Sequence, residues 1–321
     1  MTQPSPPHAA SAPRVLAVLG AVLVGVLTAS QSRVNSALAL EIGDGYLASV
    51  ISFGSGLVIL LTVLAFWRPG RDGIAWLVVA VRSRRTPWWY LFGGFAGALF
   101  VLSQGLTGSL LGVALFTIAV VCGQTLSGLV VDRLGMGSVA PAAITITRLL
   151  GSLLALVAVG WAVSSQIRSD IAIWVFVLPL LAGIGIGWQQ AVNGQVRVAA
   201  GSALTATLVN FVAGTTALAV AAIVHVSIVG WPEALPGTPW LYLGGLLGAI
   251  FIGLGVVVVR HTGVLLLGLG AIAGQLLMSL ALDFLAPVAG RGVEWTTVLG
   301  TALTLAAVLI AAIPSRAIRW L

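Results

Sequence analysis

The sequence predicts an all-α membrane protein of about ten transmembrane helices, arranged as two inverted five-helix repeats. Three observations lead to this prediction. The composition is too apolar for a domain surrounded by water, ten apolar runs have the length of a membrane span, and rare polar residues recur at a fixed spacing in the two halves.

The composition identifies the solvent of this protein. Of the 321 residues, 59% are hydrophobic and only 7% are charged, whereas about a quarter of the residues of a soluble domain are charged. A surface so poor in charge suits a lipid bilayer, which excludes the soluble enzymes. The single cysteine, Cys122, allows no intramolecular disulfide. The sequence shows no metal-ligand cluster, nucleophile elbow or phosphate loop, so we expect neither metal nor cofactor.

The chain divides into a short tail and two halves. Residues 1–13 are rich in proline and serine and are predicted to be a disordered cytoplasmic N-terminus. A span needs about 20 mostly apolar residues. By that criterion the first repeat, residues 14–163, contains helices near 15–38, 46–67, 88–107, 111–131 and 138–162. The second repeat, residues 164–321, contains helices near 171–195, 203–225, 239–259, 263–284 and 294–313.

The arginines predict the orientation of these helices. If the N-terminus is cytoplasmic, eleven of the fifteen basic residues, all arginine, fall in cytoplasmic segments and only Arg168 and Arg291 fall on the opposite side. Such a bias places both termini in the cytoplasm. The net charge of +7 forms no basic face, so we expect the lipid bilayer and not nucleic acid as the partner.

The repeat is visible in polar residues that are rare in membrane helices. At an offset of 158 residues, Gln31 and Asn35 match Gln189 and Asn193. At an offset of 151, further matches pair Gly123-Gln124 with Gly274-Gln275 and Asp132 with Asp283. Each repeat has an odd number of helices, so the second starts on the opposite side of the membrane from the first. Inverted repeats of this kind are the recurrent plan of secondary transporters.

The matched amides are the first candidate substrate-binding residues. Gln31 and Asn35 lie four residues apart and therefore share a helix face, as do Gln189 and Asn193. Two interpretations remain open. The amides line a central cavity for a small molecule, or they join helices through hydrogen bonds that contribute about 0.6 kcal/mol each. Trp188, well inside its helix, either stacks on an aromatic or cationic substrate or packs against neighbouring helices.

Charged residues inside the helices form a second group of candidates. Arg148 lies about ten residues into its expected helix, so we expect it to face protein or water, paired with a carboxylate or binding an anionic substrate. Arg33 is closer to a helix end, where it can snorkel.

The remaining polar positions have structural or gating roles in this interpretation. Asp132 and Asp283 are either polar groups at helix ends or a gating pair with Arg133 or Arg33. Gln124 and Gln275, the other matched amides, are grouped with them.

Several segments resemble a known family. They are GVLTASQSRVNSAL (25–38) with its echo GIGIGWQQAVNGQV (183–196), SFGSG (52–56) with NFVAG (210–214), and the two GQ pairs. They resemble the drug/metabolite transporter superfamily, and are most similar to its YdcZ-type family of bacterial inner-membrane proteins. The resemblance implies a ten-helix fold in the bacterial cytoplasmic membrane and leaves a homodimer open.

The function that architecture and resemblance imply is secondary transport. We expect an exporter of a small organic metabolite or drug that works by alternating access, and not an enzyme. Two alternatives stay open: a membrane scaffold or transporter subunit without cargo, and an enzyme acting on a lipid substrate. The second would need paired acidic or metal-binding groups, and the sequence offers only scattered ones.

Overall fold

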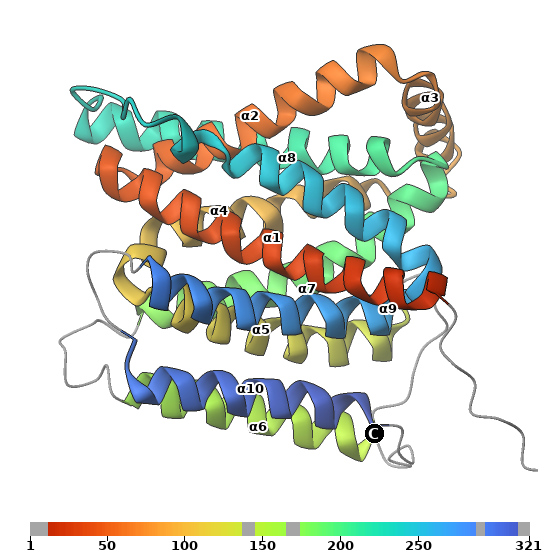
Figure 1. The fold of residues 1–321 in the computed structure, drawn as a ribbon. Helices are drawn as coiled ribbons and strands as arrows, with labels where there is room; N and C mark the ends of the chain where they lie inside the picture. The colour runs from red at the N-terminus through yellow and green to blue at the C-terminus, as the bar shows by residue number, and fades with distance from the viewer. Residues whose placement is uncertain (1–11, 137–144, 165–173, 287–292, 314–321) are drawn as a thin grey trace, which may run out of the picture.

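A computed structural model describes residues 12–136, 145–164, 174–286 and 293–313, and these residues are helical almost throughout (Figure 1). The predicted N-terminal tail falls largely outside them, as do residues 138–144 and 171–173 of two predicted helices. The first half contains α1 (Ala12–Ile42), α2 (Gly45–Phe66), α3 (Arg68–Arg82), η1 (Trp88–Phe92), α4 (Gly93–Leu111), α5 (Val113–Leu134) and α6 (Ile146–Ser164). The second contains α7 (Trp174–Ala200), α8 (Ala203–Val229), η3 (Pro239–Tyr242), α9 (Gly244–Leu285) and α10 (Trp295–Ala312).

Helix length and composition confirm a multi-pass membrane protein. Among the described residues, seven helices are long and apolar enough to cross a membrane: Leu16–Ile42, Gly45–Phe66, Trp88–Leu111, Val113–Val131, Trp174–Ala200, Ala203–Val229 and Leu267–Leu285. Shorter apolar helices cover Ile146–Trp161, Gly244–Gly255 and Trp295–Ala311. Each of the ten predicted spans overlaps one of these segments.

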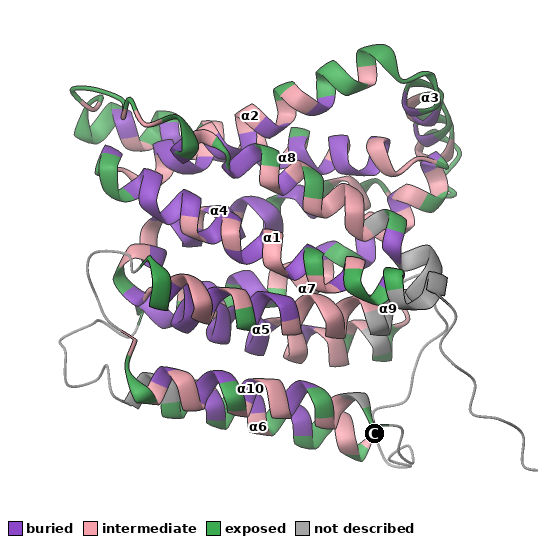
Figure 2. Cartoon of the chain, viewed as in Figure 1, coloured by how far each residue is buried: buried purple, intermediate pink, exposed green. Residues whose placement is uncertain are grey.

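Large apolar side chains cover the outside of the bundle. Val58, Phe66, Ile223 and Leu309 are 63%, 87%, 68% and 66% exposed, and the outer faces of their helices are coloured as exposed in Figure 2. A water-soluble monomer rarely presents a continuous apolar surface of this kind. The surface is therefore the face that contacts lipid tails.

Helix α3 lies where the sequence predicted a loop. The prediction searched for spans of about 20 apolar residues, whereas α3 has 15 residues and arginine at both ends. Its apolar residues Ile74, Leu77, Val78 and Val81 follow the i, i+3, i+4, i+7 spacing of a one-sided amphipathic helix. The segment before η3 that corresponds to it, residues 230–238, contains no helix. Helix α3 is therefore an addition confined to the first half.

Helix α9 replaces two predicted helices with one element, yet its contacts show that it doubles back. A β-carbon on Gly20 of α1 would lie 2.8 Å from Val258, and one on Gly270 would lie 2.7 Å from Ala21. Twelve residues of straight helix span about 18 Å, so Val258 and Gly270 can meet neighbouring residues of α1 only if α9 reverses between them. The predicted pair of antiparallel segments is therefore present within a single helical element.

Two phenyl rings pack at the centre of the bundle. Phe53 of α2 and Phe211 of α8 stack with ring centroids 4.8 Å apart. The Phe53 ring lies against Gly214, and the Phe211 ring lies against Gly56. Each ring thus fills the space left by a glycine of the other helix. The two phenylalanines, like the two glycines, are 158 positions apart in the sequence.

Glycine also sets the outer helix pairs. In α1 and α9, Gly25 lies against the backbone of Ala271, and Gly274 lies against that of Val22. Helices α5 and α7 meet in the same way through Gly123 and Gly183. Close backbone approach of this kind supplies van der Waals contact where lipid provides no hydrophobic driving force between helices. At the edge of the bundle opposite α2 and α3, α6 and α10 lie side by side (Figure 1).

The turns that start α2 and α8 have the same construction. Gly43 and Gly201 adopt φ values of +75° and +61°, which favour glycine. The next residues, Asp44 and Ser202, are the N-caps of the two helices and accept hydrogen bonds from backbone N–H groups of the first turn.

Replacing Gly56 by alanine should destabilise the protein, whereas Gly54→Ala should not. A β-carbon at Gly56 would overlap the Phe211 ring, while one at Gly54 would meet nothing within 4 Å. Overpacking of this kind costs about 1–3 kcal/mol, and helix propensity changes equally in the two variants. Thermal unfolding in detergent measures the difference. Equal melting temperatures of the two variants would show that the space beside Gly56 for the Phe211 ring does not contribute to stability.

Candidate functional site

Buried polar side chains of α1 and α4 form a first amide cluster, made of Gln31, Ser32, Asn35, Ser36 and Gln104. Asn35 Nδ2 donates to Gln104 Oε1 at 2.6 Å, and Gln104 Nε2 donates to Ser32 Oγ at 2.9 Å. Ser36 Oγ donates to the carbonyl of Gln104 at 3.0 Å. All five side chains are at most 2% exposed. Gln104 is therefore the centre of a closed hydrogen-bond network.

A second amide cluster joins α7 and α8 and consists of Gln189, Asn193 and Asn210. Gln189 Nε2 donates to Asn210 Oδ1 at 3.0 Å. Gln189 and Asn210 are buried, whereas Asn193 is half-buried. On the same helix Trp188 is half-buried and Gln190 is exposed. This cluster is consequently more open than the first.

Both clusters rest on glycines at matching positions. Gln31 lies against Gly248 and donates through Nε2 to the carbonyl of Gly244 at 2.9 Å. Gln189 lies against Gly97, where a β-carbon would come within 2.6 Å of its Nε2. In the same way, Asn35 lies against Gly244 and Asn193 against Gly93. The matched amides therefore have matched surroundings, because each pair packs against the backbone of α4 or α9.

The phenyl stack lies close to both clusters. A β-carbon at Gly97 would lie 2.6 Å from Gln189 and 3.1 Å from the Phe53 ring. One at Gly248 would lie 2.5 Å from Gln31 and 3.4 Å from the Phe211 ring. Because the two rings stack on each other, they connect the surroundings of Gln31 with those of Gln189. The matched amides thus each lie near one ring of the stack.

Several buried polar atoms of the clusters have no hydrogen-bond partner among the described residues. They include Gln31 Oε1, Asn35 Oδ1 and Asn210 Nδ2. Most buried polar atoms in native proteins are paired. These atoms can therefore accept or donate hydrogen bonds to a polar small molecule. Their amide chemistry recognises N–H, O–H and carbonyl groups and carries no charge.

Asp283 occupies a position that differs in kind from these amides. It is 8% exposed, and its carboxylate accepts hydrogen bonds from the backbone N–H groups of Val113 and Ala114 at 2.9 and 2.7 Å. Those groups start α5, directly after Gly112, the non-helical residue between α4 and α5, whose φ is +77°. Arg33 lies close enough to attract Asp283 electrostatically, and its Nε donates to the carbonyl of Ala286 at 3.0 Å. Asp283 and Arg33 thus anchor α9 to α5 and α1.

The structure places Arg148 differently from the prediction. Helix α6 begins at Ile146, so Arg148 lies in its first turn and not ten residues inside a span. Its backbone N–H donates to Thr145 Oγ1 at 3.4 Å, and its side chain is only partly buried. A position at a helix end allows the side chain to reach polar surroundings. Arg148 does not join the amide clusters.

The other predicted polar residues lie apart from the clusters or outside the description. Gln275 is buried, and its Nε2 has no partner among the described residues. Gln124 is half-buried on α5, where its carbonyl lies 3.5 Å from the place of a β-carbon on Gly187. Asp132 ends α5, but its side chain falls outside the described residues.

Sequence reasoning missed Gln104 and Asn210. Gln104 was overlooked because its counterpart at an offset of 151 is Gly255, so the repeat comparison gave no signal. Its place as a rare amide inside a membrane span could have identified it. Asn210 lies in the segment NFVAG, but its counterpart is Ser52, so the repeat contains no matched amide at this position.

These features define the class as a multi-pass helical membrane protein with a polar, glycine-lined centre. A family model described as "Putative inner membrane exporter, YdcZ" matches residues 16–161 and again residues 174–310. The chain therefore belongs to the YdcZ family of the drug/metabolite transporter superfamily, as the resemblance of its motifs implied.

A comparison with solved structures adds the fold alone. A crystal structure of another protein is similar over 93% of this chain and 96% of that one, with 17% sequence identity and a TM-score of 0.52. No curated protein sequence matches the chain.

The first amide cluster should behave as one coupled unit. Gln104→Leu leaves Asn35 without its acceptor, and a buried unpaired polar group costs about 1–3 kcal/mol. Adding Asn35→Leu should then cost less than Asn35→Leu does in the wild type. Thermal unfolding of the two single variants and the double variant measures this coupling. Losses that simply add would show that the two amides act independently.

Substitution of Asp283 by asparagine should loosen the start of α5. The amide offers one acceptor oxygen in place of two and removes a negative charge from a helix N-terminus, which together cost about 1–3 kcal/mol. Glu294→Gln is the matched control, because Glu294 is the N-cap residue of α10 but its side chain makes no capping hydrogen bond. Unchanged proteolysis and melting of Asp283→Asn would contradict the anchoring role.

Proposed function

We propose that this protein is a secondary transporter that exports a small organic metabolite or drug by alternating access. The observation that carries the proposal is the pair of amide clusters, which contain matched residues and each lie near one ring of the phenyl stack. Membership of a family described as inner-membrane exporters supports it. Its chemistry is binding and passage, and no enzymatic step is part of it.

The proposed architecture is ten spans in two inverted five-helix repeats. Residues that match at the offsets of 158 and 151 make matching contacts, which supports it. The contact of Phe53 with Gly214 corresponds to that of Phe211 with Gly56, and the contact of Gln31 with Gly248 corresponds to that of Gln189 with Gly97. The family model also matches the chain twice, once in each half. Inverted repeats let a central site open to each side in turn when the halves exchange conformations.

The two clusters are proposed to be the two faces of one substrate path. With both termini in the cytoplasm, Asn35 and Gln104 lie toward the outer ends of their helices, and Asn193 and Asn210 lie toward the inner ends. The closed network around Gln104 then seals the outer side. Near the same outer end, His225 Nε2 of α8 lies 3.4 Å from Asp44 Oδ2 of α2, and the His225 ring stacks on Tyr46.

The more open second cluster is then the cytoplasmic entrance. Asn193 and Trp188 are half-buried and Gln190 is exposed, so a cytoplasmic molecule can reach them. Amides and an indole ring suit an uncharged polar or aromatic substrate. Transport requires the phenyl rings to leave their glycine seats so that the substrate can pass to Gln31 and Asn35. The described conformation is therefore the inward-facing state in this proposal.

Cysteine labelling tests the proposed state. In a Cys122→Ala background, which removes the only and fully buried thiol, Asn193→Cys should react with an impermeant maleimide applied to the cytoplasmic side. Asn35→Cys should remain unlabelled because it lies in the closed cluster. Reaction of Asn35→Cys from the same side, or of Asn193→Cys only from the outside, would contradict the assignment of the two sides.

A ligand screen and flux measurement test transport itself. A compound that binds the folded protein raises its melting temperature. At a concentration of a hundred times its Kd, it adds about 2.7 kcal/mol to the free energy of unfolding. Such a compound should lose its effect in Gln189→Leu and Asn193→Leu, whereas Gly54→Ala should retain it. Its flux in proteoliposomes should fall in the same variants. Binding and flux that survive both substitutions would favour the amides as helix-joining groups.

A further inference from the structure

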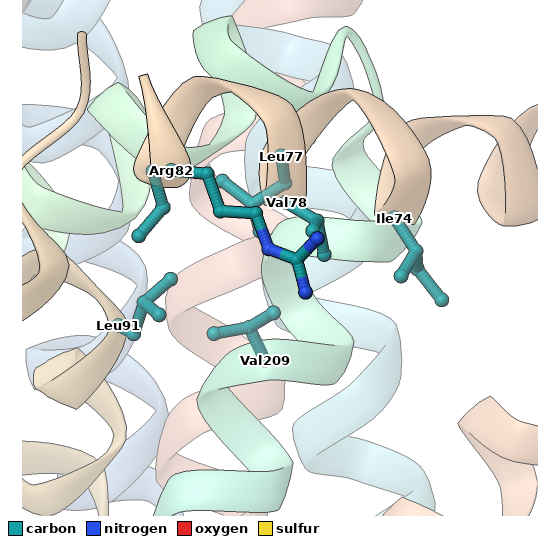
Figure 3. A pocket seen from close by; sticks show the side chains of 7 residues that line it. Ile74, Leu77, Val78, Arg82, Leu91 and Val209 are labelled. Carbon is teal, nitrogen blue, oxygen red and sulfur yellow. The ribbon is translucent and has the colours of Figure 1, made fainter. Parts of the chain in front are cut away.

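An apolar groove lies between part of the added helix α3 and the bundle. Its volume is about 310 Å³, at the lower end of the range for ligand pockets. The lining side chains are aliphatic apart from one arginine: Ile74, Leu77, Val78, Val81, Arg82, Leu91 and Val209. Figure 3 shows the Arg82 side chain reaching from α3 over the groove toward Val209. The groove therefore combines a hydrocarbon-like interior with one fixed positive charge.

Arg82 has no partner among the described residues, unlike Arg71 near the other end of α3. The guanidinium of Arg71 donates to the carbonyls of Leu64 and Ala65 at the end of α2. Arg82 is exposed and has no hydrogen bond or ion pair with a described residue. Around it, residues 68–85 contain five arginines and one aspartate. The surroundings of the groove thus favour an anion.

Tryptophans place the groove at the level of the membrane interface. Trp67 directly precedes α3, Trp76 lies in the middle of it and Trp88 starts η1, and they are 56%, 61% and 65% exposed. Exposed indole rings concentrate where lipid headgroups meet hydrocarbon. A molecule in this groove therefore has access to both the headgroups and the acyl chains of one leaflet.

The geometry points to an anionic phospholipid as the occupant. One acyl chain lies in the groove between α3 and α8, and the lipid phosphate binds the guanidinium of Arg82. The aliphatic lining accommodates the chain through the hydrophobic effect, and the excess of arginine selects a headgroup with net negative charge. A soluble polar metabolite would leave the apolar wall unused. The inference does not depend on transport.

Occupancy of the groove also bears on the second amide cluster. Val209 immediately precedes Asn210, and Leu91 lies two residues before Gly93, on which Asn193 rests. A lipid chain packed against Val209 and Leu91 would therefore restrain the helices that hold this cluster. Bound anionic lipid should favour the conformation described by the structure.

Native mass spectrometry of the purified full chain in detergent tests this site, with dioleoylphosphatidylglycerol and dioleoylphosphatidylcholine as probes. Wild type should bind the anionic lipid more tightly than the zwitterionic one. Arg82→Gln should weaken anionic lipid binding at least about fivefold. Arg85→Gln removes an exposed arginine that does not line the groove and should change binding less than twofold.

A second variant separates the groove from the surface charge. Val209→Phe fills the groove and leaves every charge in place, so it should also weaken the anionic lipid. Ile74→Phe fills the groove from α3 and replaces it if Val209→Phe does not fold. Equal binding of both lipids by wild type, equal losses in Arg82→Gln and Arg85→Gln, or full binding by the filled-groove variant would each overturn the proposal in favour of diffuse attraction.

Discussion

The reciprocal seating of Phe53 and Phe211 is the contact on which the centre of the bundle depends. Lipid tails are as apolar as phenyl rings, so burial from water cannot drive these helices together. What remains is close contact, and Gly56 and Gly214 permit it because they have no side chain. The same rings lie close to the two amide clusters. One packing arrangement therefore holds the fold together and supports the surroundings of its polar centre.

The amide clusters also depend on close approach of helices at glycine. An amide in hydrocarbon must find polar partners inside the protein, and a bulky facing helix would keep those partners out of reach. Gly244 and Gly248 bring the backbone of α9 close enough for Gln31 to bond a carbonyl. Close-packed protein interiors have discrete arrangements and do not deform continuously. A conformational change must therefore move rings and amides together.

The sequence predicts features that single helices carry by themselves, such as apolar spans and matched polar residues. It does not predict contacts between helices that are distant in the chain. Apolar runs gave the helices, and matched rare residues gave Gln31, Asn35, Gln189 and Asn193. The search window for full spans concealed α3, whose amphipathic pattern is shorter. Gln104 was missed because the second half has Gly255 in its place. That Asp283 would anchor the start of α5 could not be predicted, because that contact joins helices distant in sequence.

Differences between the halves bear on the direction of the proposed cycle. When two inverted halves exchange conformations, Asn193 would take the position of Asn35, but Gly255 offers it no amide in place of Gln104. Because Gly194 also stands in place of Ser36, three hydrogen bonds of the first cluster have no equivalent. At about 0.6 kcal/mol each, their loss amounts to about 2 kcal/mol, or a population ratio of roughly twenty to thirty. Unless substrate binding offsets this difference, the resting protein should keep its outer side closed and its cytoplasmic cluster accessible, as an exporter requires.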